Sequence, residues 1–456
     1  MKNEDTICAI ATAPGNSGVG IIRISGENSI EIADKIFFPA NKKSLADFSD
    51  RKIIFGHIKN FDGKIIDEVI LLIMRSPKSY TKENVVEIQS HGGSVVLREI
   101  LKLTLESGAR LAERGEFTKR AFLNGRIDLS QAQAVLDIIQ AKTSTALDAA
   151  QNRLAGKTSK KIREIRSEIL EVLAHIEAVI DFPEDDVDEI FTDDIRKKIF
   201  VQIEKISNFL KNKNSGKILR EGLETAIIGK PNVGKSSLLN FLAETDRAIV
   251  TEIPGTTRDS IEEFINIRGV PLKIIDTAGI RNSENIVEKI GIDKAKNFAE
   301  TAELILALFD GSKNLSEEDE EIFKLIENKN AVILLTKSDL PQILTEEQIK
   351  HFTNEKIFSV STKTGEGFEK VFDEIINRVG NIDAENIFVR DEREADLLRR
   401  SLKHLQEAEK TAENNFGIDF ISIDLRAALE LLSEITGESV TEDVINEIFS
   451  KFCIGK

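Results

Sequence analysis

The segment Gly229–Ser236 reads GKPNVGKS, and it constrains the fold more strongly than any other stretch of this chain. It follows the apolar run TAII and precedes SLLNFL, a strand–loop–helix context that predicts a phosphate-binding loop. Glycines in such a loop let backbone N–H groups face phosphates. Lys235 is expected to reach the β- and γ-phosphates, and the Ser236 hydroxyl to bind magnesium. A glycine-rich turn without a ligand is the alternative, which the flanking strand and helix disfavour.

Two further segments supply the magnesium-binding and phosphate-sensing groups that such a loop requires. GTTRD, at 255–259, offers Thr257 as a second magnesium ligand from a switch loop. DTAG, at 276–279, follows an apolar run. There Asp276 would hold the metal through water, and the Gly279 N–H could face the γ-phosphate. The order of these segments predicts magnesium-dependent binding of a nucleoside triphosphate.

Two later segments predict which base of the nucleotide is bound. TKSD, at 336–339, places Asp339 where its carboxylate can accept two hydrogen bonds from guanine, which adenine cannot supply. VSTK, at 360–363, would complete the base site. The full set predicts a GTPase of the translation-factor class. The residues expected to contact GTP are Asn232, Val233, Gly234, Lys235, Ser236, Ser237, Thr251, Glu252, Ile253, Pro254, Gly255, Thr256, Thr257, Asp276, Thr277, Ala278, Gly279, Thr336, Lys337, Ser338, Asp339, Ser361, Thr362 and Lys363.

Two positions depart from the common GTPase pattern. Thr336 stands where that class usually has Asn. Threonine keeps an oxygen but loses the amide, so we expect lower nucleotide affinity with the choice of guanine retained. Ile280 stands where Ras-like GTPases have a Gln that orients water. The catalytic group must therefore come from elsewhere in the chain.

The pattern of apolar and polar residues along the chain predicts its domain organisation. Strands and helices alternate between about 221 and 380, which predicts a doubly wound α/β domain. The first 124 residues mix short Val- and Ile-rich runs with turns and one helix, an α+β pattern. Apolar stripes such as Ile162–Ile180 predict helices on both sides of the α/β block. We expect one helical domain with the GTPase domain inserted into it, and domain bounds of 1–124, 125–220, 221–380 and 381–456.

The composition limits which cellular compartment and which binding partners can be expected. The chain has two cysteines, Cys8 and Cys453, and a formal net charge of −16. Two thiols offer no disulfide framework and suit a reducing compartment. The N-terminus lacks the apolar core of a signal peptide, and no apolar run approaches the roughly 20 residues that span a bilayer. We expect a cytoplasmic protein with no membrane partner, and not a bulk basic nucleic-acid binder.

Segments outside the GTPase block carry a family resemblance. They are DTICAIATAPGNSGVGIIRISG, YTKENVVEIQSHGG, GEFTKRAFLNGRIDLSQAQAV and the C-terminal FCIGK. Over essentially its whole length the chain resembles the tRNA-modification GTPase family called MnmE or TrmE. Lys82 and Asn84 replace the family's usual Gly and Asp, and Arg114 replaces a usual Pro. The resemblance implies a homodimer through an α+β N-terminal domain of tetrahydrofolate-binding type, a central α-helical domain and an inserted α/β P-loop GTPase domain.

The resemblance also implies a reaction. With the flavin-dependent MnmG protein, in a heterotetramer, the family adds an aminomethyl or carboxymethylaminomethyl group to carbon 5 of the wobble uridine of certain tRNAs. The one-carbon unit comes from a tetrahydrofolate derivative in its 5-formyl or methylene form. Matching motifs assign folate contacts to Arg23, Glu87, Arg126 and Lys456. Charge suits the three cations to the glutamate carboxylates of folate and Glu87 to its amino-pterin edge. Without the resemblance, Arg23 and Glu87 are ordinary strand residues.

The segment FCIGK is expected to be a free tail with Gly455 as a flexible joint. We expect it to bring Cys453 and Lys456 to the folate site across the dimer. The Cys453 thiol could then act as a nucleophile or an acid. Packing of Cys453 in the core is the alternative, because free cysteines are commonly buried.

The resemblance assigns two further catalytic features. Asn232 stands where potassium-activated members carry Asn, and oxygens of Thr251, Ile253 and Thr256 could surround a potassium ion. An extra cation between phosphates would stabilise developing charge as an arginine finger does. Glu288 matches the family's catalytic Glu and would orient the attacking water in place of the missing Gln.

A second function fits the GTPase motifs equally well. It is a regulatory GTPase of the ribosome-assembly type, with accessory domains for docking. The folate-like segments near the N-terminus and the FCIGK tail favour tRNA modification over this alternative.

Overall fold

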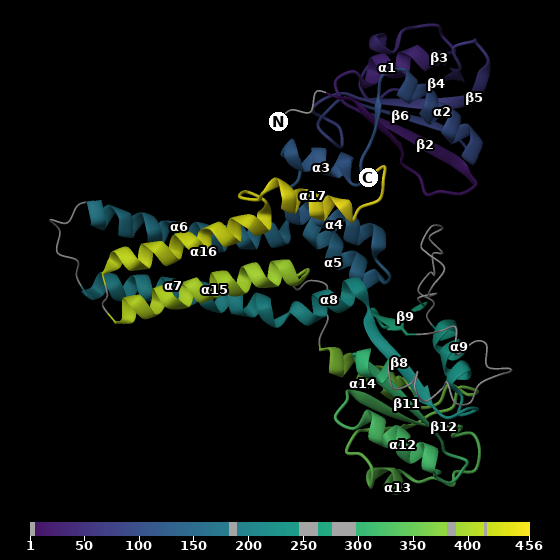
Figure 1. The fold of residues 1–456 in the computed structure, drawn as a ribbon, viewed down its shortest axis with the longest axis vertical. Helices are drawn as coiled ribbons and strands as arrows, with labels where there is room; N and C mark the ends of the chain where they lie inside the picture. Colours follow the sequence, from purple (N-terminus) through teal and green to yellow (C-terminus); the bar gives the residue numbers. More distant parts are fainter. Residues whose placement is uncertain (1–4, 182–188, 246–262, 276–297, 381–388, 415–416) are drawn as a thin grey trace. The chain divides into compact units, whose positions relative to one another are not determined.

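A computed structural model describes residues 5–181, 189–245, 263–275, 298–380, 389–414 and 417–456. The chain divides into two compact units, traced from purple to yellow in Figure 1. The first comprises residues 1–136, 159–166 and 429–456, and the second comprises 137–158 and 167–428. Within the described residues, no helix combines the length and the apolar character that crossing a membrane requires. The domain bounds drawn from the sequence stay predictions.

The first unit contains a seven-stranded sheet in the order β3-β4-β5-β6-β2-β1-β7. All neighbours run antiparallel except β1 and β7. Helices α1 (Ser29–Ile36) and α2 (Ser94–Glu106) pack against the sheet, and apolar side chains of both layers form one buried cluster. The strands and the helix predicted from the apolar runs are confirmed to within a few residues. The strands are β1 (Ile7–Ile10), β2 (Ser17–Ser25), β3 (Phe37–Pro39), β4 (Ile53–Lys59), β5 (Ile65–Met74), β6 (Val85–Gly92) and β7 (Arg110–Leu111).

Three shorter helices complete the first unit. They are α3 (Glu116–Leu123), α17 (Glu442–Ser450) and α4 (Leu129–Gln140), whose residues from 137 on belong to the second unit. Leu129 and Leu136 of α4 share a buried cluster with Phe449 of α17. Residues more than 300 positions apart in the sequence therefore build one core.

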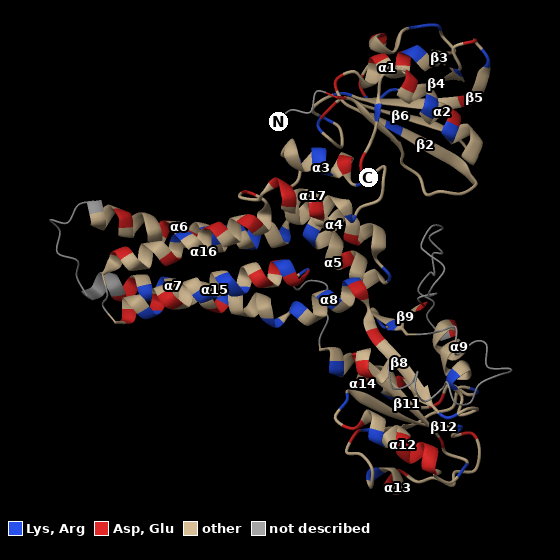
Figure 2. Cartoon of the chain, viewed as in Figure 1, with Lys and Arg blue, Asp and Glu red and all other residues tan. Residues whose placement is uncertain are grey.

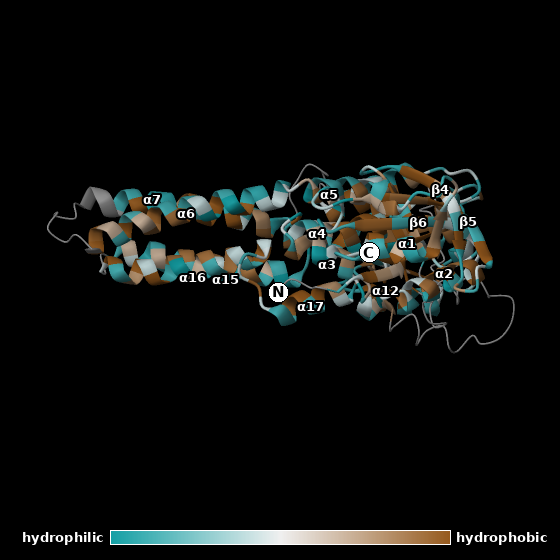
Figure 3. Ribbon diagram, turned by 90° about the horizontal axis from the view of Figure 1, so that it is seen from above, coloured by the Kyte–Doolittle hydropathy of each residue, from teal (hydrophilic) through white to brown (hydrophobic). Residues whose placement is uncertain are grey.

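Helices form much of the second unit. They include α5 (Ser144–Leu154), α7 (Glu189–Lys211), α8 (Lys213–Glu221) and α15 (Glu392–Glu413), while α6 (Lys157–Asp181) and α16 (Ile418–Thr436) extend across the division between the units. Acidic and basic residues interleave along α15 (Figure 2), and polar and apolar residues alternate along α7 and α15 (Figure 3). The stripe predicted on α6 is confirmed from Ile162 to Ile176, which are buried, whereas Ile180 is exposed.

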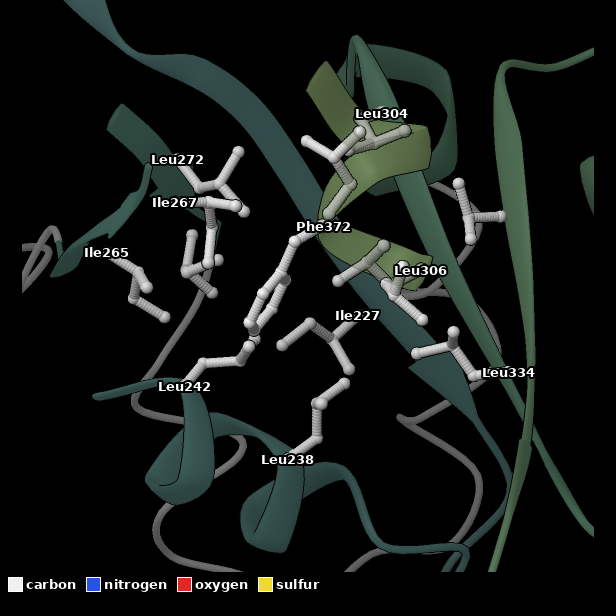
Figure 4. Close-up of a cluster of buried hydrophobic side chains, with 14 of the residues drawn as sticks. Ile227, Leu238, Leu242, Ile265, Ile267, Leu272, Leu304, Leu306, Leu334 and Phe372 are labelled. Atoms are coloured by element: carbon white, nitrogen blue, oxygen red, sulfur yellow. The ribbon is translucent and has the colours of Figure 1, made fainter. Parts of the chain in front are cut away.

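The predicted α/β block is a six-stranded sheet in the order β13-β12-β11-β8-β10-β9. Five strands are parallel, as a doubly wound α/β domain requires, and β9 pairs antiparallel with β10 at the edge. Leu238 and Leu242 of α9 and Phe372 of α14 point into one core around Ile227 of β8 (Figure 4). The elements are β8 (Leu223–Gly229), α9 (Lys235–Thr245), β9 (Glu263–Ile267), β10 (Val270–Ile274), β11 (Leu304–Asp310), α12 (Glu317–Ile326), β12 (Ala331–Thr336), α13 (Glu346–Lys350), β13 (Ile357–Ser359) and α14 (Phe368–Val379).

Candidate functional site

The predicted phosphate-binding loop lies between the end of β8 and the start of α9. Its backbone turns through Asn232 and Gly234, whose φ angles are 62° and 108°. The Lys235 ammonium donates to the carbonyls of Gly229 at 2.5 Å and Lys230 at 2.7 Å. Burial lowers the pKa of Lys235. The ammonium is thus held inside the loop, where an anionic phosphate would relieve the cost of burying its charge.

The end of β12 is bonded to this loop through Thr336. Its hydroxyl lies 2.8 Å from the carbonyl oxygen of Val233 and 3.1 Å from that of Phe309. A hydroxyl has one hydrogen, so it donates to one of these oxygens at a time. The residue that replaces the usual Asn therefore still ties the base-binding strand to the phosphate loop.

The neighbouring Lys337 makes a second tie to the loop. Its ammonium donates to the carbonyl of Asn232 at 3.1 Å and to Asp310 Oδ2 at 2.6 Å. Asp310 is buried at the end of β11 and also accepts from the Ser312 hydroxyl at 2.7 Å. Burial would raise the pKa of Asp310, but hydrogen bonds from Lys337 and Ser312 outweigh it, and the pKa is lowered. Asp310 was not predicted as a site residue from the sequence. It could have been, because it is a carboxylate at the end of an apolar strand, and that strand pairs with the one that leads into the base motif.

The base motif is hydrogen-bonded to the segment that follows β13. The Ser361 hydroxyl donates to Asp339 Oδ1 at 2.8 Å. Backbone N–H groups of Lys363 and Thr364 donate to that hydroxyl, and the Ser338 N–H donates to the carbonyl of Val360. The structure therefore brings together the phosphate loop, TKSD and VSTK. The remaining predicted contacts lie outside the described residues: Thr251, Glu252, Ile253, Pro254, Gly255, Thr256, Thr257, Asp276, Thr277, Ala278, Gly279 and Glu288.

A second group of predicted residues meets in the first unit. Arg23 and Glu87 are opposite one another on β2 and β6, and Arg23 Nε donates to Glu87 Oε1 at 2.8 Å. Arg23 Nη1 also donates to the carbonyl of Gly455 at 3.2 Å. The pair is mostly buried, with side-chain exposures of 17% and 15%. We call Arg23, Glu87, Tyr80, Arg126 and the tail 453–456 the N-terminal cluster.

Tyr80, the single tyrosine of the chain, joins the two arginines of this cluster. The guanidinium carbons of Arg126 and Arg23 lie 4.6 Å and 5.9 Å from the centre of its ring. Its hydroxyl lies 2.9 Å from that of Thr118 on α3. The sequence reading missed Tyr80, because only the folded chain brings it between two arginines that lie 103 positions apart.

Lys82 shows why one departure from the family pattern is tolerated. Its φ angle of 59° is in the left-handed region that favours glycine, which is the residue the family usually has. Its ammonium donates to the carbonyl of Gly125 at 2.9 Å, beside Arg126. The substitution thus adds a contact between the loop that carries Tyr80 and the segment that carries Arg126.

The expectation of a free tail is wrong. Ile454 forms a β-bridge with Arg114, and the Gly115 N–H donates to the Cys453 carbonyl at 3.2 Å. Gly455 has φ of 93°, and a Cβ there would lie 2.3 Å from the Ile10 carbonyl oxygen. Glycine is needed for this close approach and not for flexibility. The Cys453 side chain is exposed, so its packing in the core is also wrong.

Comparisons with known proteins extend these observations. A family model described as the MnmE helical domain matches residues 129–453, and one described as the GTP-binding protein TrmE N-terminus matches residues 6–126. A tRNA modification GTPase MnmE of Clostridioides difficile (strain 630) is 49% identical, and the match covers 100% of each chain. One of Alkaliphilus oremlandii (strain OhILAs) is 47% identical with the same coverage.

A solved structure of the G domain of the T. maritima FeoB iron transporter is also similar. It is 22% identical, with a TM-score of 0.27, over 35% of this chain and 99% of that chain. The two curated relatives, in contrast, match from end to end.

Proposed function

The chain belongs to the tRNA modification GTPase MnmE family, and from that premise we propose that it hydrolyses GTP in the service of tRNA modification. The finer proposal is that, with the flavin-dependent MnmG protein, it adds an aminomethyl or carboxymethylaminomethyl group to carbon 5 of a wobble uridine. The proposed GTP hydrolysis rests on one observation: Thr336 and Lys337 of the base motif are hydrogen-bonded directly to the phosphate loop. These bonds set the spacing between a site for phosphates and a site for guanine.

Residues of the second unit have distinct roles in GTP binding. Lys235 and the loop N–H groups bind phosphates, and the Asp339 carboxylate binds guanine. Ser236 and Thr257 would hold Mg²⁺, whose charge stabilises the transferring phosphoryl group. Glu288 would orient the attacking water, since Ile280 cannot.

Potassium is proposed as an activating ion held by Asn232, Thr251, Ile253 and Thr256. Asn232 supports this role, because its carbonyl is fixed by Lys337 and its backbone lies in the strained left-handed region. We expect GTP hydrolysis to slow at least about tenfold when sodium replaces potassium at equal ionic strength, because a misfit cation stabilises the developing charge less. Phosphate release assays in the two salts measure this. Equal rates would refute a potassium site.

The N-terminal cluster is proposed to hold the tetrahydrofolate derivative in a domain of folate-binding type. Arg23, Arg126 and Lys456 supply cations for the glutamate carboxylates, and Glu87 can accept from the amino-pterin edge. The flat ring of Tyr80 adds an apolar surface of the kind on which aromatic rings pack. When bound, the folate supplies the one-carbon unit. The residues named here bind and orient it.

A homodimer through the N-terminal domain is supported by an exposed apolar face. Phe55 of β4 is opposite Ile70 of β5, and their exposures are 50% and 41%. Ile53 of β4 and Phe38 of β3 are also exposed. Exposed apolar patches of this kind mark interfaces. We expect Phe55→Asp to convert a dimer to a monomer, because a charge would be buried without a partner. Light scattering measures the mass, and Lys64→Asp on an exposed turn is the control.

Further partners follow from the family. We propose a heterotetramer with MnmG and tRNA as substrate, in the cytoplasm, with no membrane partner. The alternative function is a regulatory GTPase of the ribosome-assembly type. Mass spectrometry of wobble nucleosides from a strain lacking this chain distinguishes them. Loss of the modified uridines is expected, and unchanged uridines would favour the alternative.

A further inference from the structure

The turn between β9 and β10 is fixed to a helix outside the GTPase sheet. Thr143 precedes α5, and its hydroxyl donates to the carbonyl of Gly269 at 2.9 Å. Thr143 is only 7% exposed, so this bond is shielded from water. All of these residues belong to the second compact unit.

The Thr143 hydroxyl has two roles at once. It accepts from the Ala146 N–H at 3.1 Å and so caps the first turn of α5, while it donates its hydrogen to Gly269. The Thr145 side chain also packs directly on Gly269, since a Cβ on Gly269 would lie 2.2 Å from the Thr145 hydroxyl oxygen. The Lys142 ammonium lies 5.1 Å from the centre of the Phe264 ring on β9. Lys142, Thr143 and Thr145 thus join this hairpin to α5.

The β9–β10 hairpin lies in the sequence between the two segments predicted to bind magnesium and the γ-phosphate. β9 begins at Glu263, six positions after Thr257, and β10 ends at Ile274, two positions before Asp276. Thr257 and Asp276 are the residues predicted to sense magnesium and the γ-phosphate. The hairpin therefore joins the two segments that distinguish GTP from GDP, and its turn is bonded to α5.

We propose that Thr143 is a positioning residue that couples the bound nucleotide to the helical part of the chain through the β9–β10 hairpin. A nucleotide that binds the segments at both ends of the hairpin shifts the position of its turn. Because the Thr143 hydroxyl is bonded to both the Gly269 carbonyl and the Ala146 N–H, the first turn of α5 shifts with it. The inference rests on the proposed function for the identity of the nucleotide. Coupling of this kind is reciprocal, and it changes equilibria by roughly 5–150-fold.

Three variants distinguish the bond from Thr143 to the Gly269 carbonyl from the capping of α5 by the same hydroxyl. Thr143→Asp keeps an oxygen that accepts from the Ala146 N–H and caps a helix well, but it cannot donate to the Gly269 carbonyl. Thr143→Ser keeps both roles. Thr345→Asp is the matched control, because Thr345 caps α13 by accepting from the Gln348 N–H in the same unit.

The direct measurement is hydrogen–deuterium exchange of the full-length chain with GDP and with a non-hydrolysable GTP analogue. In the wild type and Thr143→Ser, protection of the amides of 146–147 should differ between the two nucleotides by roughly 5–150-fold. In Thr143→Asp that difference should vanish. Equal protection with both nucleotides in the wild type, or a difference retained in Thr143→Asp, would overturn the proposal.

Activity gives a second, separable readout. Thr143→Asp should bind GTP and hydrolyse it at rates close to the wild type, yet support tRNA modification at least about fivefold more slowly. An equal loss in Thr345→Asp would assign the effect to helix capping and overturn the proposal. Wild-type protein that does not modify tRNA would instead refute the proposed function, and the exchange experiment would still decide the coupling.

Discussion

Replacing Asp339 by Asn should exchange the nucleotide preference from guanine to xanthine. The Asp339 carboxylate can accept from both N–H groups on the guanine edge. An Asn offers one acceptor and one N–H donor, which leaves one guanine donor unpaired and matches the carbonyl that xanthine has in its place. A site built to pair a polar edge rejects an unpaired analogue by about 10⁴–10⁵-fold. We expect GTP affinity to fall by at least about 10³-fold and XTP affinity to rise correspondingly.

Competition of GTP, XTP and ATP against a fluorescent guanine nucleotide measures this exchange. Ser361→Ala is the control, because it removes the hydroxyl that donates to Asp339 Oδ1 but leaves the carboxylate in place. It should weaken GTP binding by about tenfold or less, the range of one hydrogen bond, and leave guanine preferred. A variant Asp339→Asn that still prefers GTP over XTP would show that another group reads the base.

Replacing Cys453 by Ser should abolish tRNA modification while the folate derivative still binds. The exposed thiol lies on the tail that is bonded to Arg23 through Gly455, within three residues of Lys456. A serine hydroxyl has nearly the same shape but is a far weaker nucleophile and acid near neutral pH. We expect modification to fall by at least about 10³-fold, the usual scale for loss of a covalent nucleophile, with GTP hydrolysis unchanged. Isotope incorporation into tRNA measures the rate.

Two controls frame the Cys453 experiment. Deleting Lys456 should weaken folate binding and leave GTP hydrolysis intact, because one cation is lost from the cluster. Alkylation of the native protein should act on Cys453 alone, since burial raises the pKa of Cys8 to about 12. A normal rate of modification in Cys453→Ser would exclude any chemical role for the thiol.

Much of the GTPase domain could be predicted from local sequence. The phosphate loop, TKSD and VSTK each follow a strand, and parallel strands bring their carboxyl ends to one edge of the sheet. The edge strand β9 was not predicted, because its five residues, EFINI, include Glu263 and Asn266 and so lack the continuous apolar run that marks the buried parallel strands. Asp310 was missed for a related reason. Its role depends on Lys337, its neighbour across two paired strands.

The N-terminal cluster could be predicted only in part. Arg23, Glu87 and Arg126 came from the family resemblance, and the structure brings them together around Tyr80. No local pattern marks Tyr80, since its role depends on distant arginines. The tail was expected to be flexible because glycine commonly is, whereas the close approach of Gly455 to Ile10 gives the opposite result.

The bond between Arg23 and the Gly455 carbonyl also bears on how the chain is made. Its partners are separated by 432 positions, so the cluster cannot close until residues 453–456 have left the ribosome. At about 5–20 residues per second, that is roughly 20–90 seconds after Arg23 is synthesised. The sheet that carries Arg23 is complete at residue 111, long before the GTPase domain is translated. A chain interrupted after residue 380 would therefore carry both the sheet and the nucleotide site, but never the closed cluster.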